Sequence, residues 1–98
     1  MAMFYEKRIR SFSVLERELR HLDSDAGVRV VGTFRNRPCF AFVTRFEGIY
    51  TTMIHVRGGS TAAPRVGRRI LAREFESREE LAKFLKALMP RRVEAYLY

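Results

Sequence analysis

Residues 37–59, RPCFAFVTRFEGIYTTMIHVRGG, combine the pattern of a β-hairpin with an excess of positive charge. β-Branched and aromatic residues, which favour strands, recur in both halves of the segment. Between the halves, Glu47 and Gly48 suit a two-residue hairpin turn. The segment holds three arginines and only one acidic residue, Glu47. We therefore expect two antiparallel strands, 39–46 and 49–56, that carry a basic surface.

Further strands are predicted on both sides of this hairpin. Residues 28–35, VRVVGTFR, place valines and a phenylalanine among polar positions, as in a strand with one buried face. Residues 57–67, RGGSTAAPRVG, are interrupted by glycine and proline and predict a loop. Residues 68–75, RRILAREF, have the composition of a strand that follows this loop. Weaker strand patterns lie near the two ends of the chain, at 3–12 and 92–98.

Two Ser-x-x-Glu capping boxes mark the expected starts of two helices. In the first box Ser13 is the predicted N-cap and Glu16 lies three residues later. The second box has Ser77 and Glu80, and Pro90 is expected to stop the helix that follows. Each helix has one apolar face, formed by Leu15, Leu19 and Leu22 in the first and by Leu81, Phe84, Leu85 and Leu88 in the second.

These elements give the order β-α-β-β-β-β-α-β in a single domain, residues 1–98. A run of hairpins with one helix before it and one after it predicts an α+β fold, a two-layer sandwich with a mainly antiparallel sheet. Both helices are expected to cover one face of the sheet and to leave the other face free.

The composition is that of a globular protein, with 47% hydrophobic and 31% charged residues. No apolar run approaches the ~20 residues that cross a bilayer. The opening stretch MAMFYEKRIRS is broken by charge within six residues, which is unlike a secretory signal. The only cysteine, Cys39, opens an apolar run, and we expect it to be a small core residue. A single cysteine fits a reducing, cytoplasmic location. Without a membrane-spanning apolar run, we expect no membrane partner.

Arginine is strongly preferred over lysine in this chain, with sixteen arginines to three lysines. There is no glutamine, and Asn36 is the single asparagine. Few thermolabile amides are one mark of hyperthermophile proteins, which suggests a thermophilic, archaeal source. A GC-rich genome is the alternative explanation for the arginine excess.

The positive charge is concentrated in one part of the chain. Residues 26–73 contain nine arginines and one acid, so this segment carries the whole net charge of +8. The rest of the chain has ten basic and ten acidic residues and sums to zero. Crowded arginines repel one another, and an anionic partner would relieve that repulsion.

The turn at 36–38 decides which sheet face is buried, because a shift of one residue reverses both faces. A three-residue loop pairs Arg35 with Cys39 and directs the three phenylalanines of residues 39–46 into the core. A two-residue or four-residue loop directs them to the free face. We favour the three-residue loop, because a tight two-residue turn there would need Pro38 to donate its closing hydrogen bond.

In either register we expect a non-enzymatic protein that binds single-stranded RNA or DNA. Unpaired bases stack on aromatic or guanidinium planes, while arginines pair with the phosphates. In the favoured register the predicted nucleic-acid-binding residues are Arg29, Arg35, Arg37, Arg45, Tyr50, Arg57, Arg65, Arg68 and Arg69. In the alternative register Phe40, Phe42, Phe46 and His55 contribute to the binding face.

No motif typical of a catalytic site occurs in the sequence. There is no paired-histidine zinc spacing, no P-loop and no G-x-S-x-G, and only two aspartates are present. His21 lies near Asp23 and Asp25, a pattern that suits a solvated helix end better than a metal site. His55 is interpreted as a partly buried structural histidine. We therefore expect neither an enzyme nor a bound cofactor.

A second hypothesis is a protein–protein interaction module, either a homodimer or a small subunit of a larger complex. Residues 92–98, RVEAYLY, place Tyr96 and Tyr98 on the same side of a strand. An exposed terminal strand can pair with the sheet of a neighbouring molecule.

Overall fold

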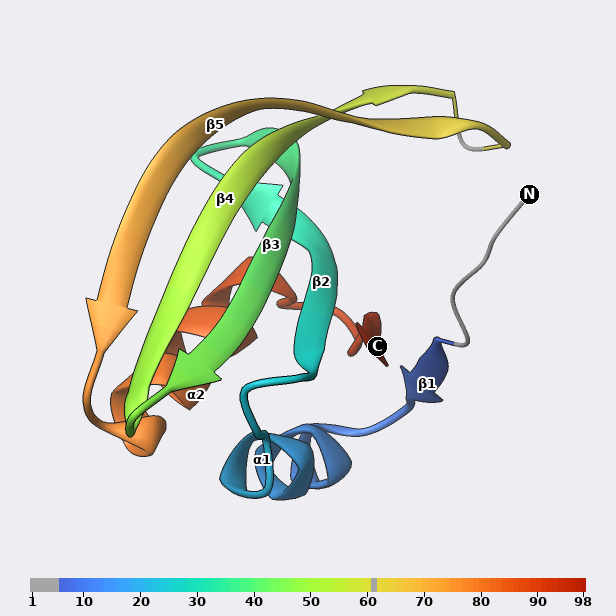
Figure 1. Ribbon diagram of the computed structural model, residues 1–98. Helices are drawn as coiled ribbons and strands as arrows, with labels where there is room; N and C mark the ends of the chain where they lie inside the picture. The colour runs from blue at the N-terminus through green and yellow to red at the C-terminus, as the bar shows by residue number, and fades with distance from the viewer. Residues whose placement is uncertain (1–5, 61) are drawn as a thin grey trace.

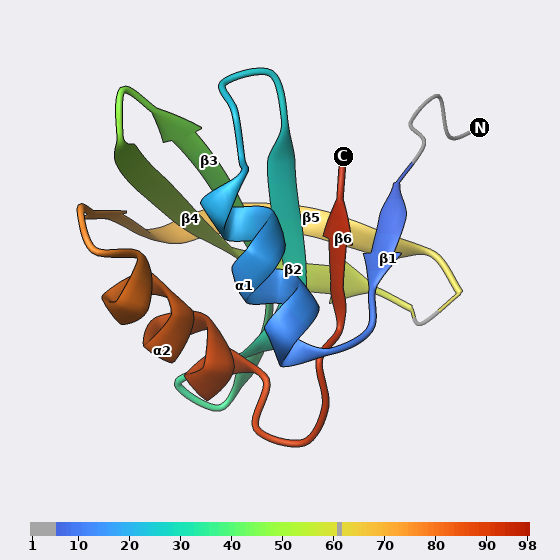
Figure 2. The same cartoon turned by 90° about the horizontal axis from the view of Figure 1, so that it is seen from below.

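The computed structural model describes residues 6–60 and 62–98 as a six-stranded antiparallel sheet with two helices. The strand order is β1-β6-β2-β3-β4-β5, and both helices cover one face (Figures 1 and 2). This confirms the predicted two-layer α+β sandwich. The elements are β1 (Lys7–Ile9), α1 (Phe12–Arg20), β2 (Gly27–Phe34), β3 (Arg37–Phe46), β4 (Ile49–Gly59), β5 (Pro64–Phe75), α2 (Arg78–Leu88) and β6 (Ala95–Leu97).

Both turns of the central meander are two residues long. Glu47 and Gly48 join β3 to β4 with φ values of 51° and 82°, which confirms the predicted turn. Arg35 and Asn36 join β2 to β3 with φ values of 52° and 66°. Positive φ at both central residues is typical of a type I′ turn, which matches the twist of the flanking strands.

The favoured three-residue loop at 36–38 is therefore wrong. The turn lies one residue earlier than we assumed, so Phe34 pairs with Arg37 and Thr33 pairs with Pro38. In an antiparallel hairpin the pair next to the closing pair makes no ladder hydrogen bond, so Pro38 has no bond to donate. Pro38 is therefore compatible with a two-residue turn in this register.

The register directs the phenylalanines of β3 away from the helices, so the expectation that they fill the core is also wrong. Cys39, Ala41 and Val43 point into the core instead, and all three are fully buried. The open face, defined here as the sheet face without helices, carries Phe40 and Phe42.

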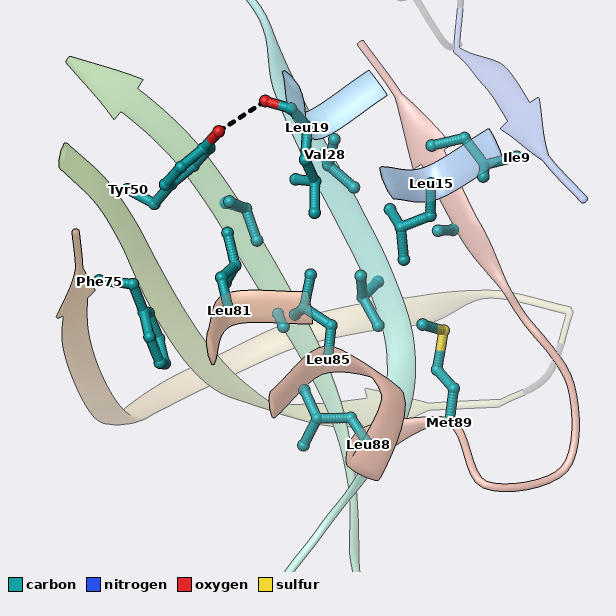
Figure 3. Close-up of a cluster of buried hydrophobic side chains, with 14 of the residues drawn as sticks. Ile9, Leu15, Leu19, Val28, Tyr50, Phe75, Leu81, Leu85, Leu88 and Met89 are labelled. Atoms are coloured by element: carbon teal, nitrogen blue, oxygen red, sulfur yellow. Dashed lines mark hydrogen bonds between the residues drawn. The ribbon is translucent and has the colours of Figure 1, made fainter. Parts of the chain in front are cut away.

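The core lies between the sheet and the two helices (Figure 3). Leu15 and Leu19 of α1 and Leu81 and Leu85 of α2 are fully buried, as the apolar faces predicted. Full burial of such a side chain stabilises the fold by ~1.5–3 kcal/mol. Small residues of β3 suffice on this face because the leucines of the helices fill the space above them.

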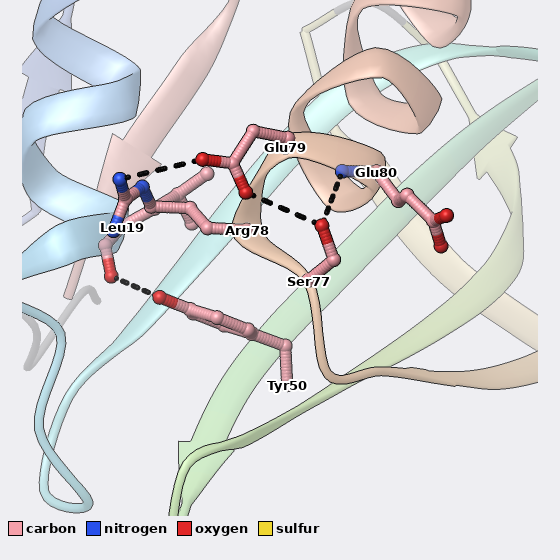
Figure 4. Close-up of polar contacts among 6 residues, drawn as sticks. All are labelled: Leu19, Tyr50, Ser77, Arg78, Glu79 and Glu80. Atoms are coloured by element: carbon pink, nitrogen blue, oxygen red, sulfur yellow. Dashed lines mark hydrogen bonds and ion pairs between the residues drawn. The ribbon is translucent and has the colours of Figure 1, made fainter.

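One of the two predicted helix starts is confirmed. The Glu80 backbone N–H donates to Ser77 Oγ at 3.2 Å, so Ser77 caps α2 (Figure 4). The prediction for α1 is wrong, because Ser11 is the N-cap and accepts from the Val14 backbone N–H at 3.3 Å. Ser13 lies inside the first turn.

The terminal strands are shorter than predicted. β1 covers only three residues of the expected strand 3–12, and residues 3–5 lie outside the described residues. β6 lies between β1 and β2. The prediction that residues 92–98 form an exposed terminal strand is wrong, because both edges of β6 are paired.

The predicted loop 57–67 is mostly strand, which corrects that expectation. β4 continues to Gly59 and β5 begins at Pro64, so only residues 60–63 connect them. Register shifts beside His55 mark bulges, which bend and twist a hairpin. Residues 57–60 and 62–67, here called the arm, reach over β2 and β6 on the open face (Figures 1 and 2). No helix of the described residues is long and apolar enough to cross a membrane.

Candidate nucleic-acid interface

The open face carries a row of alternating cationic and aromatic side chains. Register pairs connect Arg8, Tyr96, Arg29, Phe42 and Met53 in that order across five neighbouring strands. The guanidinium carbons of Arg8 and Arg29 lie 5.8 Å and 4.5 Å from the centre of the Tyr96 ring. Both distances are within the range of a cation–π contact.

A second aromatic group lies next to this row. Phe40 is paired with His55, and Phe42 meets the His55 ring edge-on at 5.6 Å between ring centres. Phe40 is buried because two guanidinium groups cover it, those of Arg29 at 5.4 Å and Arg57 at 5.9 Å. The open face is thus built from planar groups in contact with one another.

Arg29 is held in a fixed orientation by a carboxylate. Its Nε and Nη2 atoms donate to the two oxygens of Glu6 at 3.1 Å and 2.7 Å. This hydrogen bonding to Glu6 raises the pKa of Arg29 above its ordinary value. Such a two-bond pair fixes the plane of the guanidinium, but it also neutralises part of the positive charge on the face.

The arm and the open face line a half-open cavity of about 440 Å³. Its walls include Arg29 and Tyr96 from the sheet and Arg57 from the arm. A second cavity of about 440 Å³ adjoins it, and Val31, Arg57 and Glu94 line both. Together the two cavities form a groove, called here the arm groove, which also contacts Arg91, Arg92 and Pro90 at the end of α2.

Sequence reasoning missed the residues that come from the ends of the chain. Arg8, Arg91, Arg92 and Tyr96 lie outside the arginine-rich segment 26–73. Arg8 and Tyr96 come close to Arg29 because β6 inserts between β1 and β2, whereas Arg91 and Arg92 lie in the connection between α2 and β6. The adjacent arginines before the last strand were a usable signal, but the position of that strand was needed to interpret them.

Two predicted site residues lie on the opposite side of the sheet. Tyr50 is buried under α1, and its hydroxyl donates to the Leu19 carbonyl at 2.7 Å (Figures 3 and 4). Arg45 lies over the Tyr50 ring at 5.0 Å and donates to the Arg20 carbonyl at 3.3 Å. The expectation that they share the exposed sheet face with Arg29 is wrong, because it depended on the incorrect register.

The other predicted residues lie around the rim of the open face or beyond it. Arg35 and Arg37 belong to the exposed β2–β3 turn region, and Arg65, Arg68 and Arg69 are exposed on β5. Phe46 is 68% exposed at the end of β3 that is far from the arm. Arg73 contacts the rings of Phe75 and Phe84 on the helix side. The basic segment is therefore divided between the two faces.

The candidate histidine and cysteine chemistry has local structural explanations. His55 Nδ1 lies 3.0 Å from the Gly67 carbonyl oxygen, a contact that ties β4 to the base of the arm. Cys39 is fully buried, and this burial raises the pKa of its thiol. His21 is exposed, and across residues 6–60 and 62–98 no three His, Cys, Asp or Glu side chains are grouped as metal ligands.

No protein-family model, curated protein or solved structure matches this chain. The functional interpretation therefore depends on the geometry of the open face and the arm groove.

Proposed function

We propose that this protein is a non-enzymatic, cytoplasmic binder of single-stranded RNA or DNA. The supporting observation is the alternating row of arginines and aromatic rings on the open face, together with the arm groove beside it. Single strands expose both bases and phosphates, and this surface offers planar groups and guanidinium donors within one site.

Stacking distinguishes single strands from duplexes in this proposal. Phe42 and Tyr96 are partly exposed on the open face and can each support one base. Each stacked base contributes ~1–3 kcal/mol, whereas the bases of a duplex are already stacked on one another. The protein is therefore expected to prefer single strands, with the phosphates directed toward Arg57, Arg91 and Arg92 in the arm groove.

A titration with labelled single strands and duplexes across a series of salt concentrations tests the proposal. The informative comparison uses two double variants that remove the same charge from different faces. Arg29→Met with Arg57→Met removes two guanidinium groups from the open face, and Arg45→Met with Arg73→Met removes two from the helix side.

Each lost phosphate contact reduces the slope of log K against log salt by ~0.7 for a single strand. The open-face variant is expected to lose ~0.7 from this slope, because Arg57 supplies one phosphate contact while Arg29 is already paired with Glu6. The helix-side variant is expected to keep the slope of the unmodified protein. Equal effects of the two variants would mean that binding follows the net charge and not this surface.

A protein–protein interaction module remains the second candidate, and exposed apolar residues favour it. Phe46 is 68% exposed, Val66 54% and Tyr98 39%. The twelve residues of β5 also form one edge of the sheet within the described residues. A homodimer or an assembly with another protein would cover these groups, and the molecular mass in solution tests the homodimer directly.

A further inference from the structure

The cavity between the arm and the sheet has the size and the chemistry of a small-ligand site. Its volume of about 440 Å³ lies within the ~300–1,000 Å³ typical of such sites. Val31 and Phe40 form an apolar base, and both are buried. The arm contributes Arg57 and Ser60, and Tyr96 lies on the strand beyond β2.

Arg57 has an unused donor at this site. Its Nε atom is enclosed and has no hydrogen-bond partner among the described residues. A donor that solvent cannot reach is also closed to a ligand in the cavity, so the groups of Arg57 that a ligand can contact there are the outer nitrogens of its guanidinium. A guanidinium presents two parallel donors that match two oxygens of a phosphate.

Arg29 has a different role in the same cavity. Two of its donor atoms are already bound to Glu6, and its guanidinium lies over the Tyr96 ring at 4.5 Å. The pair forms a flat surface, and planar bases stack on both arginine and aromatic planes. Arg57 is therefore the phosphate-binding group, and Arg29 with Tyr96 is the surface for a base.

Glu94 adds an acceptor to the cavity wall. Its carboxylate repels a phosphate placed next to it but accepts hydrogen bonds from sugar hydroxyls or base amino groups. A phosphate donor site, a planar surface and a separate acceptor match the three parts of a nucleotide. A terminal phosphate offers three free oxygens and a larger negative charge to the Arg57 guanidinium, whereas an internal phosphodiester offers two free oxygens and a single charge.

We infer that the cavity under the arm binds a nucleotide that carries a terminal phosphate, with the phosphate on Arg57. The nucleotide can be free in solution or can be the phosphorylated end of a strand. Only the strand-end case rests on the proposed function, because a free nucleotide would bind here even if the open face bound no polymer.

Calorimetric titration with adenosine 5′-monophosphate and with adenosine tests the phosphate site. The unmodified protein is expected to bind the monophosphate at least about tenfold more tightly, as charge-assisted hydrogen bonds predict. Arg57→Met should abolish this preference, and Arg57→Lys should lose most of it because lysine lacks the parallel donors of a guanidinium. Arg68→Met, which removes an exposed arginine of β5 just beyond the arm, should retain it.

Equal binding of the monophosphate and adenosine by the unmodified protein would overturn the inference without reference to any variant. A full preference in Arg57→Lys, or an equal loss in Arg68→Met, would also overturn the assignment to the Arg57 guanidinium.

Single strands with a 5′-phosphate, a 3′-phosphate or hydroxyl ends identify the source of the nucleotide. Tighter binding of a phosphorylated strand, reduced by Arg57→Met, supports a strand-end site. If strands bind equally with and without a terminal phosphate, while the monophosphate binds more tightly than adenosine, the ligand is a free nucleotide. Strand binding with neither preference overturns this inference but leaves the proposed function intact. A monophosphate preference without strand binding supports this inference and contradicts the proposed function.

Discussion

Glu6 is expected to weaken nucleic-acid binding, because it neutralises an arginine of the open face. Its carboxylate contacts Arg29 Nη2 at 2.7 Å, and the two side chains are only 30% and 21% exposed. Replacement of Glu6 with glutamine keeps a hydrogen-bond acceptor near Arg29 but removes the negative charge. The Arg29 guanidinium stays over Tyr96 and becomes available to a phosphate.

The expected gain in affinity follows from the one arginine that the Glu6 carboxylate neutralises. One additional phosphate contact steepens the slope of log K against log salt by ~0.7 for a single strand. Relative to ~1 M salt, that slope corresponds to about fivefold tighter binding at ~0.1 M. Loss of the ion pair should lower the free energy of unfolding by no more than ~1 kcal/mol, because it is partly exposed to solvent.

Fluorescence anisotropy with a labelled single strand, repeated across a salt series, measures both affinity and slope. Glu18→Gln is the matched control, because Glu18 pairs with Lys7 at 3.6 Å and its loss changes the net charge equally. We expect Glu6→Gln to steepen the slope and Glu18→Gln to leave it nearly unchanged. An unchanged slope in Glu6→Gln, or the same steepening in both variants, would refute the reasoning.

Three further predictions concern the fold. Ser11→Ala should lower the free energy of unfolding by ~1 kcal/mol in urea denaturation, whereas Ser13→Ala should cost much less, because Ser11 caps α1. Tyr50→Phe should cost ~1 kcal/mol by the same measurement, because the hydroxyl bond to Leu19 is lost, and should leave strand affinity unchanged. Cys39 should react with a thiol reagent only as fast as the protein unfolds, because its side chain is fully buried and burial raises the pKa of the thiol; rapid labelling of the native protein would contradict this.

The strands, helices and their order could be predicted because each of them is determined by a few neighbouring residues. Glu47 and Gly48 determine a turn by their backbone preferences, and Ser77 with Glu80 marks a helix start through one hydrogen bond. The leucine faces of both helices follow from their periodicity. These signals require only a few neighbouring residues and do not depend on the rest of the fold.

The residues of the open face could not be predicted from local patterns, because a shift of one residue in the β2–β3 turn exchanges the two faces. Arg35 and Asn36 both adopt positive φ values. Of these two residue types only asparagine is enriched in that conformation, so the turn had a weak sequence signal. The insertion of β6 between β1 and β2 is a long-range pairing without a local signal. This insertion places Tyr96 beside Arg29 on the open face, and the observed register places Tyr50 on the helix side.

A map of backbone amide chemical shifts during titration with a single strand tests the central claim most directly. We expect the largest changes on the open face and the arm, at Arg29, Phe42, His55, Arg57 and Tyr96. Changes centred on α1, α2 and the Arg45 side of the sheet, or changes spread evenly over the surface, would contradict binding on the open face.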